Sequence, residues 1–357
     1  MLATSATSSE PPHVKSDRSL AADCAAFVAI TYAFSWTLLI AGVKLGWSED
    51  SLSLSGAGPA VAALMLSRSR TTPRVRSSAS RWLWFFSLLP ICWIVLSLRS
   101  SWWSATRGLP VHLKLFQLVP ALAPAWILSS AASTNEGARS VGRRLLHPPT
   151  RWAAFALLFF PLLLGIPSAI ASVFGARLVW PDLGGVTLVS AATAAMAFFS
   201  NVLFAGTQEE PGWRGFLLDR LQTRFSPLYA SLLVWLPWAV WHGPVDYYRP
   251  VRFTLVEEVL LRVVFLIPLT IILTWFYNRS GRSIQVVVLF HAAMNTFPYV
   301  LAYYQPAWFV VFVFAAYAVI TDRMWSKIPS TSDFQNTLPD ALVTTDGSVR
   351  PAAPSPQ

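Results

Sequence analysis

Long apolar runs separated by short polar segments occupy most of this sequence. A helix needs about 20 mostly apolar residues to cross the hydrocarbon core of a membrane. These runs are apolar on all sides and too long for strands, which argues against a transmembrane barrel with its alternating strands. The predicted fold is therefore all-α, a polytopic bundle of transmembrane helices with about ten spans. The runs lie at 24–43, 52–67, 82–98, 113–132, 152–174, 186–207, 227–245, 257–277, 283–302 and 306–321.

The charged residues support a membrane location and indicate an orientation. They make up 12% of the chain, whereas a soluble domain averages about a quarter. The net charge is +10, but the basic residues fall in short clusters between apolar runs, so nucleic acid is not an expected partner. Cytoplasmic loops accumulate Lys and Arg, and the clusters at 68–81 and 139–151 alternate correctly between runs. We therefore predict an integral, multi-pass protein in contact with membrane lipid, with both termini in the cytoplasm.

The polar segments divide the chain into five predicted parts. Residues 1–20 and 329–357 are rich in Ser, Thr, Pro and Asp, which predicts disordered tails. Residues 21–180 hold the N-terminal transmembrane helices. Residues 186–305 hold a helical core with the unusual polar groups described next, and residues 306–328 hold the last transmembrane helix.

Ionisable groups within apolar runs indicate function, because burying them in a membrane is unfavourable unless they are paired or hydrated. The first such group is Glu209-Glu210, followed by Arg214. In a helix Glu210 and Arg214 lie one turn apart, so Arg214 can pair with Glu210 while Glu209 faces a pocket as a general base. Pro211 and Gly212 predict a helix break here, with an amphipathic interfacial segment over 213–225. Taken alone, the group also suits a helix end with a solvated Glu pair.

Two further elements place His residues within predicted helices. His242 follows Trp238 by one helical turn, and His291 precedes Asn295 by one turn, so each pair lies on one helix face. An imidazole can accept a proton or bind a metal, and an imidazole beside a carboxamide can stabilise an oxyanion. Either element alone is also compatible with polar contacts between helices.

Together these elements resemble the CPBP family, the CAAX prenyl endopeptidases and bacteriocin-processing enzymes also called the Abi family. Its motifs are Glu-Glu-x-x-x-Arg, aromatic-x-x-x-His and His-x-x-x-Asn, and all three occur here in order within residues 190–305. Trp238 stands where Phe is more usual. The resemblance implies an intramembrane endopeptidase acting on a membrane-associated peptide or protein, with a prenylated CAAX substrate as one candidate.

The resemblance also implies roles for the site residues. Glu209 and His242 would activate water, and His291 with Asn295 would stabilise the tetrahedral oxyanion, with Glu210 and Arg214 in support. Glu209, His242 and His291 also form a plausible zinc ligand set, so a zinc mechanism and a metal-free glutamate mechanism both stay open. The alternatives are a non-enzymatic immunity or scaffold protein that binds a peptide in the same pocket, and a proton-relaying transporter.

Overall fold

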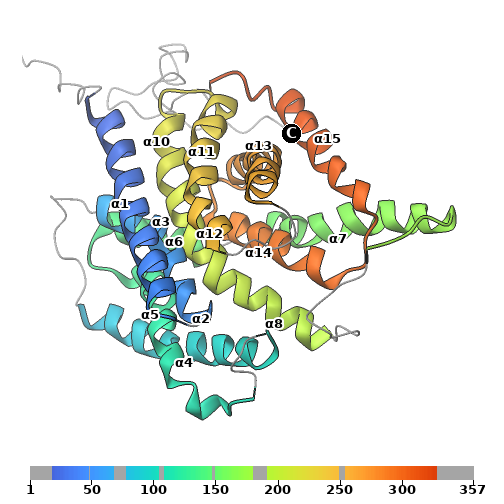
Figure 1. Cartoon of the computed structure of the whole chain (residues 1–357). Coiled ribbons are helices and arrows are strands. Elements are labelled where there is room, and N and C mark those ends of the chain that lie inside the picture. Colours follow the sequence, from blue (N-terminus) through green and yellow to red (C-terminus); the bar gives the residue numbers. More distant parts are fainter. Residues whose placement is uncertain are drawn as a thin grey trace, which may run out of the picture.

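The computed structural model of the chain describes residues 18–47, 49–67, 78–103, 108–146, 149–179, 191–248 and 254–327. Within them the one β pairing is an isolated bridge between Val179 and Tyr303, so the all-α prediction is confirmed. The predicted tail 329–357, and all but the last three residues of the tail 1–20, lie outside the described residues. The helices, shown in Figure 1, are α1 (Arg18–Lys44), α2 (Glu49–Leu52), α3 (Gly58–Leu66), α4 (Ser78–Trp103), α5 (Leu118–Ser129), α6 (Glu136–Leu146), α7 (Thr150–Val173), α8 (Ala191–Asn201), α9 (Thr207–Gly212), α10 (Asp219–Gln222), α11 (Pro227–Trp241), α12 (Gly243–Tyr248), α13 (Leu255–Arg279), α14 (Ile284–Val300) and α15 (Phe309–Thr321).

Each of the predicted apolar runs contains a helix, but the helices differ in length. In the described part of the chain, 5 helices are long and apolar enough to cross a membrane. Three shorter apolar helices cover 53–66, 284–300 and 305–321. The polytopic bundle is confirmed, and the predicted count of about ten describes apolar helices better than complete crossings. The long helices lie at 20–44, 79–100, 115–132, 150–173 and 259–279.

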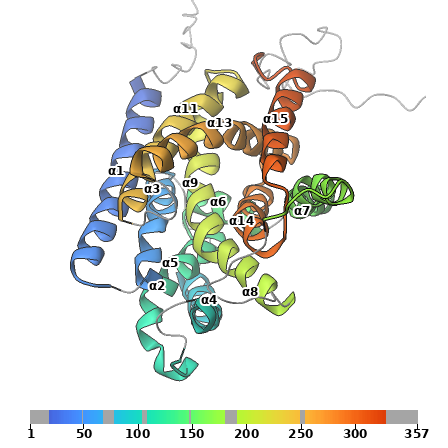
Figure 2. The ribbon, with the colours of Figure 1, turned by 45° about the vertical axis from the view of Figure 1, so that its right-hand side comes forward.

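One continuous helical rod runs through the middle of the bundle, as Figure 2 shows for α8 and α9. It comprises α8, a π-helical segment Val202–Gly206, α9, a second π-helical segment Trp213–Leu218, and α10. α3 packs on one side of α9, and α14 packs along α8 and the first π-helical segment. The segment predicted to be an interfacial amphipathic helix is instead buried over Trp213–Leu218.

Two glycines let the rod approach its neighbours closely. A Cβ atom on Gly212 would lie 2.4 Å from the carbonyl oxygen of Pro59 in the segment Gly58–Leu66. A Cβ atom on Gly206 would lie 2.9 Å from the carbonyl oxygen of Val288 in α14. Small residues allow such backbone contact between membrane helices. The position of the rod between α3 and α14 therefore depends on Gly206 and Gly212.

The predicted helix break at Pro211 and Gly212 is wrong for the same reason. π-helical turns lie on both sides of α9. Proline has no N–H to donate, and the altered hydrogen-bond pattern of a π turn lets a helix continue past such a residue. The packing of Gly212 on Pro59 favours a rod that continues past this point. Local helix-breaking preferences are thus outweighed by tertiary packing.

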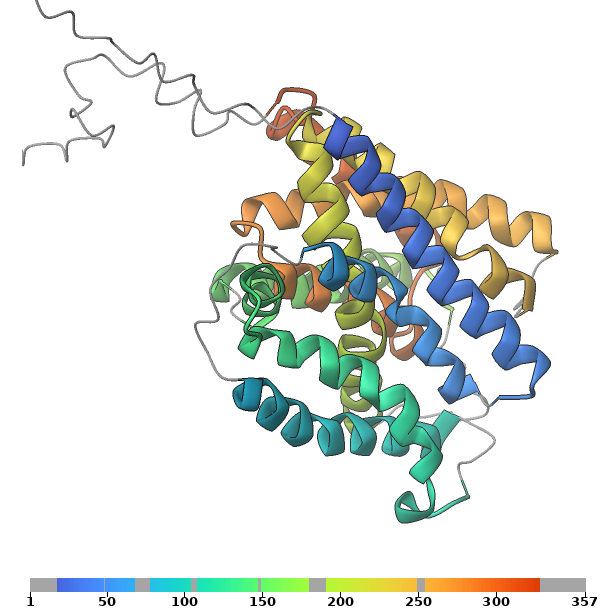
Figure 3. The ribbon, with the colours of Figure 1, turned by 90° about the vertical axis from the view of Figure 1, so that its left-hand side faces the viewer.

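The N-terminal helices pack on one side of this core. α1 lies along one face of the molecule with α3 beside it, and α4 packs against α5 (Figure 3). Two hydrogen bonds join α1 to α11: Tyr32 donates to the carbonyl of Pro237 at 2.7 Å, and Trp36 donates to the carbonyl of Trp241 at 3.0 Å. Of the N-terminal helices, α1 is therefore in direct contact with α11, the helix that ends next to His242.

Candidate active site

The rod places Glu209 and Glu210 near its centre, between its two π-helical segments. All six residues of α9 are buried. Single π turns within α-helices occur often at functional sites. Two adjacent carboxylates buried inside a helical bundle require specific partners, because an uncompensated buried charge is strongly unfavourable.

Glu210 contacts both Arg214 and His291. The Arg214 Nη1 atom donates to Glu210 Oε1 at 3.0 Å, and both side chains are fully buried. The His291 Nδ1 atom lies 2.6 Å from the same oxygen. The Arg214 guanidinium carbon lies 4.3 Å from the centre of the Trp238 ring. The predicted pairing of Arg214 with Glu210 is confirmed, and His291 joins it from α14.

Glu209 faces Trp238 of α11 and lies on the Nε2 side of His291. Its Oε2 atom accepts a hydrogen bond of 2.9 Å from the indole nitrogen of Trp238. Its Oε1 atom lies 3.9 Å from His291 Nε2, which is too long for a direct hydrogen bond. One carboxylate oxygen is therefore fixed, and the other is available for chemistry.

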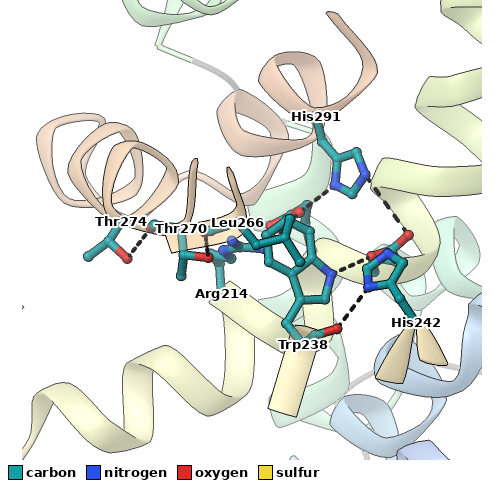
Figure 4. Close-up of polar contacts among 9 residues, drawn as sticks. Arg214, Trp238, His242, Leu266, Thr270, Thr274 and His291 are labelled. Atoms are coloured by element: carbon teal, nitrogen blue, oxygen red, sulfur yellow. Dashed lines mark hydrogen bonds and ion pairs between the residues drawn. The ribbon is translucent and has the colours of Figure 1, made fainter. Parts of the chain in front are cut away.

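His242 lies at the C-terminal end of α11, on the other side of Trp238. Its Nδ1 atom lies 2.8 Å from the carbonyl oxygen of Trp238. A carbonyl oxygen can only accept a hydrogen bond, so Nδ1 carries the proton and Nε2 keeps its lone pair. Figure 4 shows Trp238 at the centre, with Arg214, His242 and His291 around it. The ring centroids of His242 and His291 lie 5.8 Å and 6.0 Å from the Trp238 centroid.

Asn295 lies one turn after His291 on α14, as predicted from the spacing. Its backbone carbonyl oxygen accepts a hydrogen bond of 3.3 Å from Asn201 Nδ2, which also donates to Thr296 Oγ1 at 2.9 Å. In the described residues, no hydrogen bond joins the Asn295 carboxamide to Glu209, His242 or His291. Contacts thus connect Glu209, Trp238, His242 and His291, whereas Asn295 is linked to this group only by lying on the same helix as His291.

Sequence analysis missed two features of this region. It identified Trp238 as a motif aromatic but not as a hydrogen-bond donor to Glu209. It also overlooked Arg262, which pairs with Asp246 one turn after His242. The second feature could have been found, because Arg262 is an ionisable residue within the apolar run 257–277 and follows the rule applied to Glu209 and His242.

The candidate zinc ligands are Glu209, His242 and His291. Their side chains are of types that bind zinc, but the distances between them are too large for one ion. The Nδ1 atom of each His contacts an oxygen acceptor, and such a contact commonly orients metal-binding imidazoles. However, across the described residues no three His, Cys, Asp or Glu side chains are grouped closely enough to hold a metal ion. The residues as placed do not form a zinc site.

This part of the chain is similar in sequence to known proteins. Residues 191–297 match the family described as type II CAAX prenyl endopeptidase Rce1-like. A CAAX prenyl protease 2 from Methanococcus maripaludis is 28% identical over 180 residues, which cover 47% of this chain and 62% of that relative. The chain therefore matches less than two thirds of the length of this relative. The matched segment contains all three motifs, and the family resemblance predicted from them is confirmed.

Proposed function

We propose, on the premise that residues 191–297 form a CPBP-family domain, that this protein is an intramembrane endopeptidase. Its substrate is a membrane-associated peptide, with a prenylated CAAX sequence as the first candidate because the similar archaeal protein is named a CAAX prenyl protease. The observation that carries the proposal is the placement of Glu209. The residue is 7% exposed, and its carboxylate is fixed at one oxygen by Trp238 and directed at His291 with the other.

The reaction begins with a water held by Glu209 Oε1 and the lone pair of His242 Nε2. Glu209 takes a proton from this water as the water oxygen attacks the scissile carbonyl carbon. The carbonyl oxygen becomes a tetrahedral oxyanion. The C–N bond then breaks, the departing nitrogen takes the proton from Glu209, and the products are a carboxylic acid and an amine.

The oxyanion is stabilised by groups on α14. When both ring nitrogens of His291 carry protons, Nδ1 donates to Glu210 and Nε2 can donate to the oxyanion. The Asn295 carboxamide, one turn further along the same helix, supplies a second donor. Arg214 and Glu210 act as positioning residues, because they hold His291 without contacting the substrate.

No step of this mechanism uses a metal, and the metal-free form is itself part of the proposal. Purified protein, washed with a chelator and checked by elemental analysis, should keep its activity. Activity that disappears on chelation and returns with zinc would replace the proposal with a metalloprotease mechanism.

The test uses the full chain in lipid vesicles with a farnesylated CAAX peptide and its unprenylated form. Mass spectrometry of the products locates the cleaved bond. General-base catalysis contributes about 100-fold to 10 000-fold, so Glu209→Gln should reduce the rate by at least the lower figure. Glu257→Gln is the matched control. It is the same substitution, made at an exposed residue in the capping box at the start of α13. A wild-type protein that binds the peptide but leaves it intact would favour the non-enzymatic alternative.

A further inference from the structure

A second ion pair lies close to the candidate site and takes no part in the mechanism above. Asp246 of α12 is 3% exposed, and Arg262 of α13 is 30% exposed. The Arg262 Nε atom donates to both carboxylate oxygens of Asp246, at 2.9 Å and 2.7 Å. The Nη2 atom of Arg262 also contacts Asp246 Oδ1. The guanidinium is thus held rigidly by one of its edges.

The pair lies one helical turn from His242. The Asp246 backbone N–H donates to the carbonyl oxygen of His242 at 3.0 Å. Next to Arg262, Val263 accepts a hydrogen bond of 2.9 Å from the indole of Trp235 in α11, which joins the two helices. The Arg262 charge is also near enough to act on the His242 imidazole. Arg262 and the candidate catalytic groups therefore share one region.

The free edge of Arg262 suits a second carboxylate. A guanidinium has five N–H donors, and Asp246 engages only Nε and Nη2. Nη1 and the remaining Nη2 hydrogen form another edge with the geometry that binds a carboxylate through two hydrogen bonds. Arg214, the other cation at the site, is fully buried and turned toward Glu210. Of these two arginines, only Arg262 can present donors to a ligand.

The size of the proposed substrate is compatible with this placement. In a CAAX sequence three residues follow the prenylated Cys and end in a free carboxylate, and three extended residues span about 10 Å. Asp246 lies four residues after His242, or about 6 Å along a helix, and the Arg262 side chain extends further. A terminal carboxylate within a membrane needs a cation to offset its burial.

We infer that Arg262 binds the C-terminal carboxylate of the peptide substrate, with Asp246 fixing the plane of the guanidinium. This inference rests on the proposed function and adds a specificity determinant to it. Recognition of the terminal carboxylate would restrict cleavage to peptides that end near the scissile bond. The same membrane peptide within a longer chain would bind weakly.

The first test compares binding of two farnesylated peptides that differ only at the C-terminus, one with a free carboxylate and one with a carboxamide. Binding is measured on the Glu209→Gln protein in lipid vesicles, so it does not depend on turnover. A hydrogen-bonded charge pair corresponds to about tenfold or more in affinity. We expect the carboxylate peptide to bind at least about tenfold more tightly. Equal binding of both peptides would overturn the inference and leave the proposed function intact.

Two substitutions separate a ligand-binding role from a structural one, because both break the same ion pair. Arg262→Gln should remove the preference for the carboxylate peptide, leaving binding of the carboxamide peptide unchanged. Asp246→Asn should keep the preference, because Arg262 remains. If the pair only held α12 in place, the two substitutions would weaken both peptides equally, and the inference would fail.

Two further variants keep the test decisive. Arg262→Lys retains the charge without the two-pronged geometry, so it should preserve folding and show an intermediate preference. Arg279→Gln is the matched control, because Arg279 lies on the same helix and pairs with Asp322 in the same manner. Failure of the proposed function appears differently, as absence of cleavage of either peptide by the wild-type protein.

Discussion

The indole nitrogen of Trp238 donates a 2.9 Å hydrogen bond to Oε2 of Glu209, across 29 positions of sequence. The bond fixes the carboxylate so that Oε1 faces His291. A Phe side chain at this position could not donate this hydrogen bond. The indole nitrogen therefore helps to orient the candidate general base.

Replacing Trp238 with Phe should lower kcat by about tenfold, the effect of losing one hydrogen bond to a charged group. KM should change little, because the ring still packs against Arg214. Trp93→Phe is the control, since its indole donates to the Lys114 carbonyl away from the site. Peptide-cleavage kinetics of both variants check the prediction, and an unchanged kcat in Trp238→Phe would contradict it.

The Glu210 and Arg214 pair should be required for folding as well as activity. Glu210→Gln leaves the fully buried Arg214 without a charged partner, which should destabilise the protein by about 3–5 kcal/mol. Adding Arg214→Met removes the unpaired charge and should restore much of the stability. Activity should stay low, because His291 still lacks the carboxylate that contacts its Nδ1 atom and favours its protonated form. Thermal unfolding in detergent and cleavage rates measure the two effects separately, and recovery of both would show that Glu210 only neutralises Arg214.

Gly212 should not tolerate a side chain. A Cβ atom there meets the backbone of Pro59 at 2.4 Å, so Gly212→Ala should destabilise the protein by about 1–3 kcal/mol through overpacking. Gly165 lies in α7, where an added Cβ atom would have nothing within 4 Å, so Gly165→Ala should be neutral or mildly stabilising. Thermal unfolding of the pair checks this, and equal effects would contradict the close packing of α9 on the Gly58–Leu66 segment.

The predicted orientation gives a separate test, which rests on the basic clusters alone. Single cysteines placed at 68–81 and 139–151 should be shielded from a membrane-impermeant reagent added outside intact cells. They should react once the membrane is opened. Labelling of either segment from outside would overturn the prediction that both termini are cytoplasmic.

Helical spacing was sufficient to predict the contacts made within one element. The pair Glu210 and Arg214 lies at i and i+4, and the expected ion pair forms. The contact between Glu210 and His291 joins residues 81 positions apart, and no local pattern encodes it. The apolar runs determined the fold class for a related reason, because a lipid environment permits few backbone arrangements.

The predicted helix break would have placed Glu209 near the end of a helix. The rod instead continues to Gln222, so Glu209 lies about 20 Å from its C-terminal end. Local rules for Pro211 and Gly212 could not anticipate this, because the packing of Gly212 on Pro59 is a tertiary contact.

The shared role of Glu209 and His242 leads to the last prediction. Both groups are proposed to hold the same water, so either one alone is insufficient. Residues that act as a unit lose activity non-additively. Glu209→Gln and His242→Ala should each reduce cleavage by at least about 100-fold, and the double variant should be little worse than Glu209→Gln alone.

Folding should survive these changes, because the removed groups are themselves unfavourable to bury in a membrane. The matched control is a cycle of Glu209→Gln with Glu257→Gln, whose side chain is confined to the capping box of α13. There the two effects should multiply, since the residues share no contact. Single-turnover rates for the four proteins in each cycle measure the coupling directly. Multiplicative losses for Glu209 and His242 would mean that the two groups act at separate steps, and the shared-water mechanism would have to be abandoned.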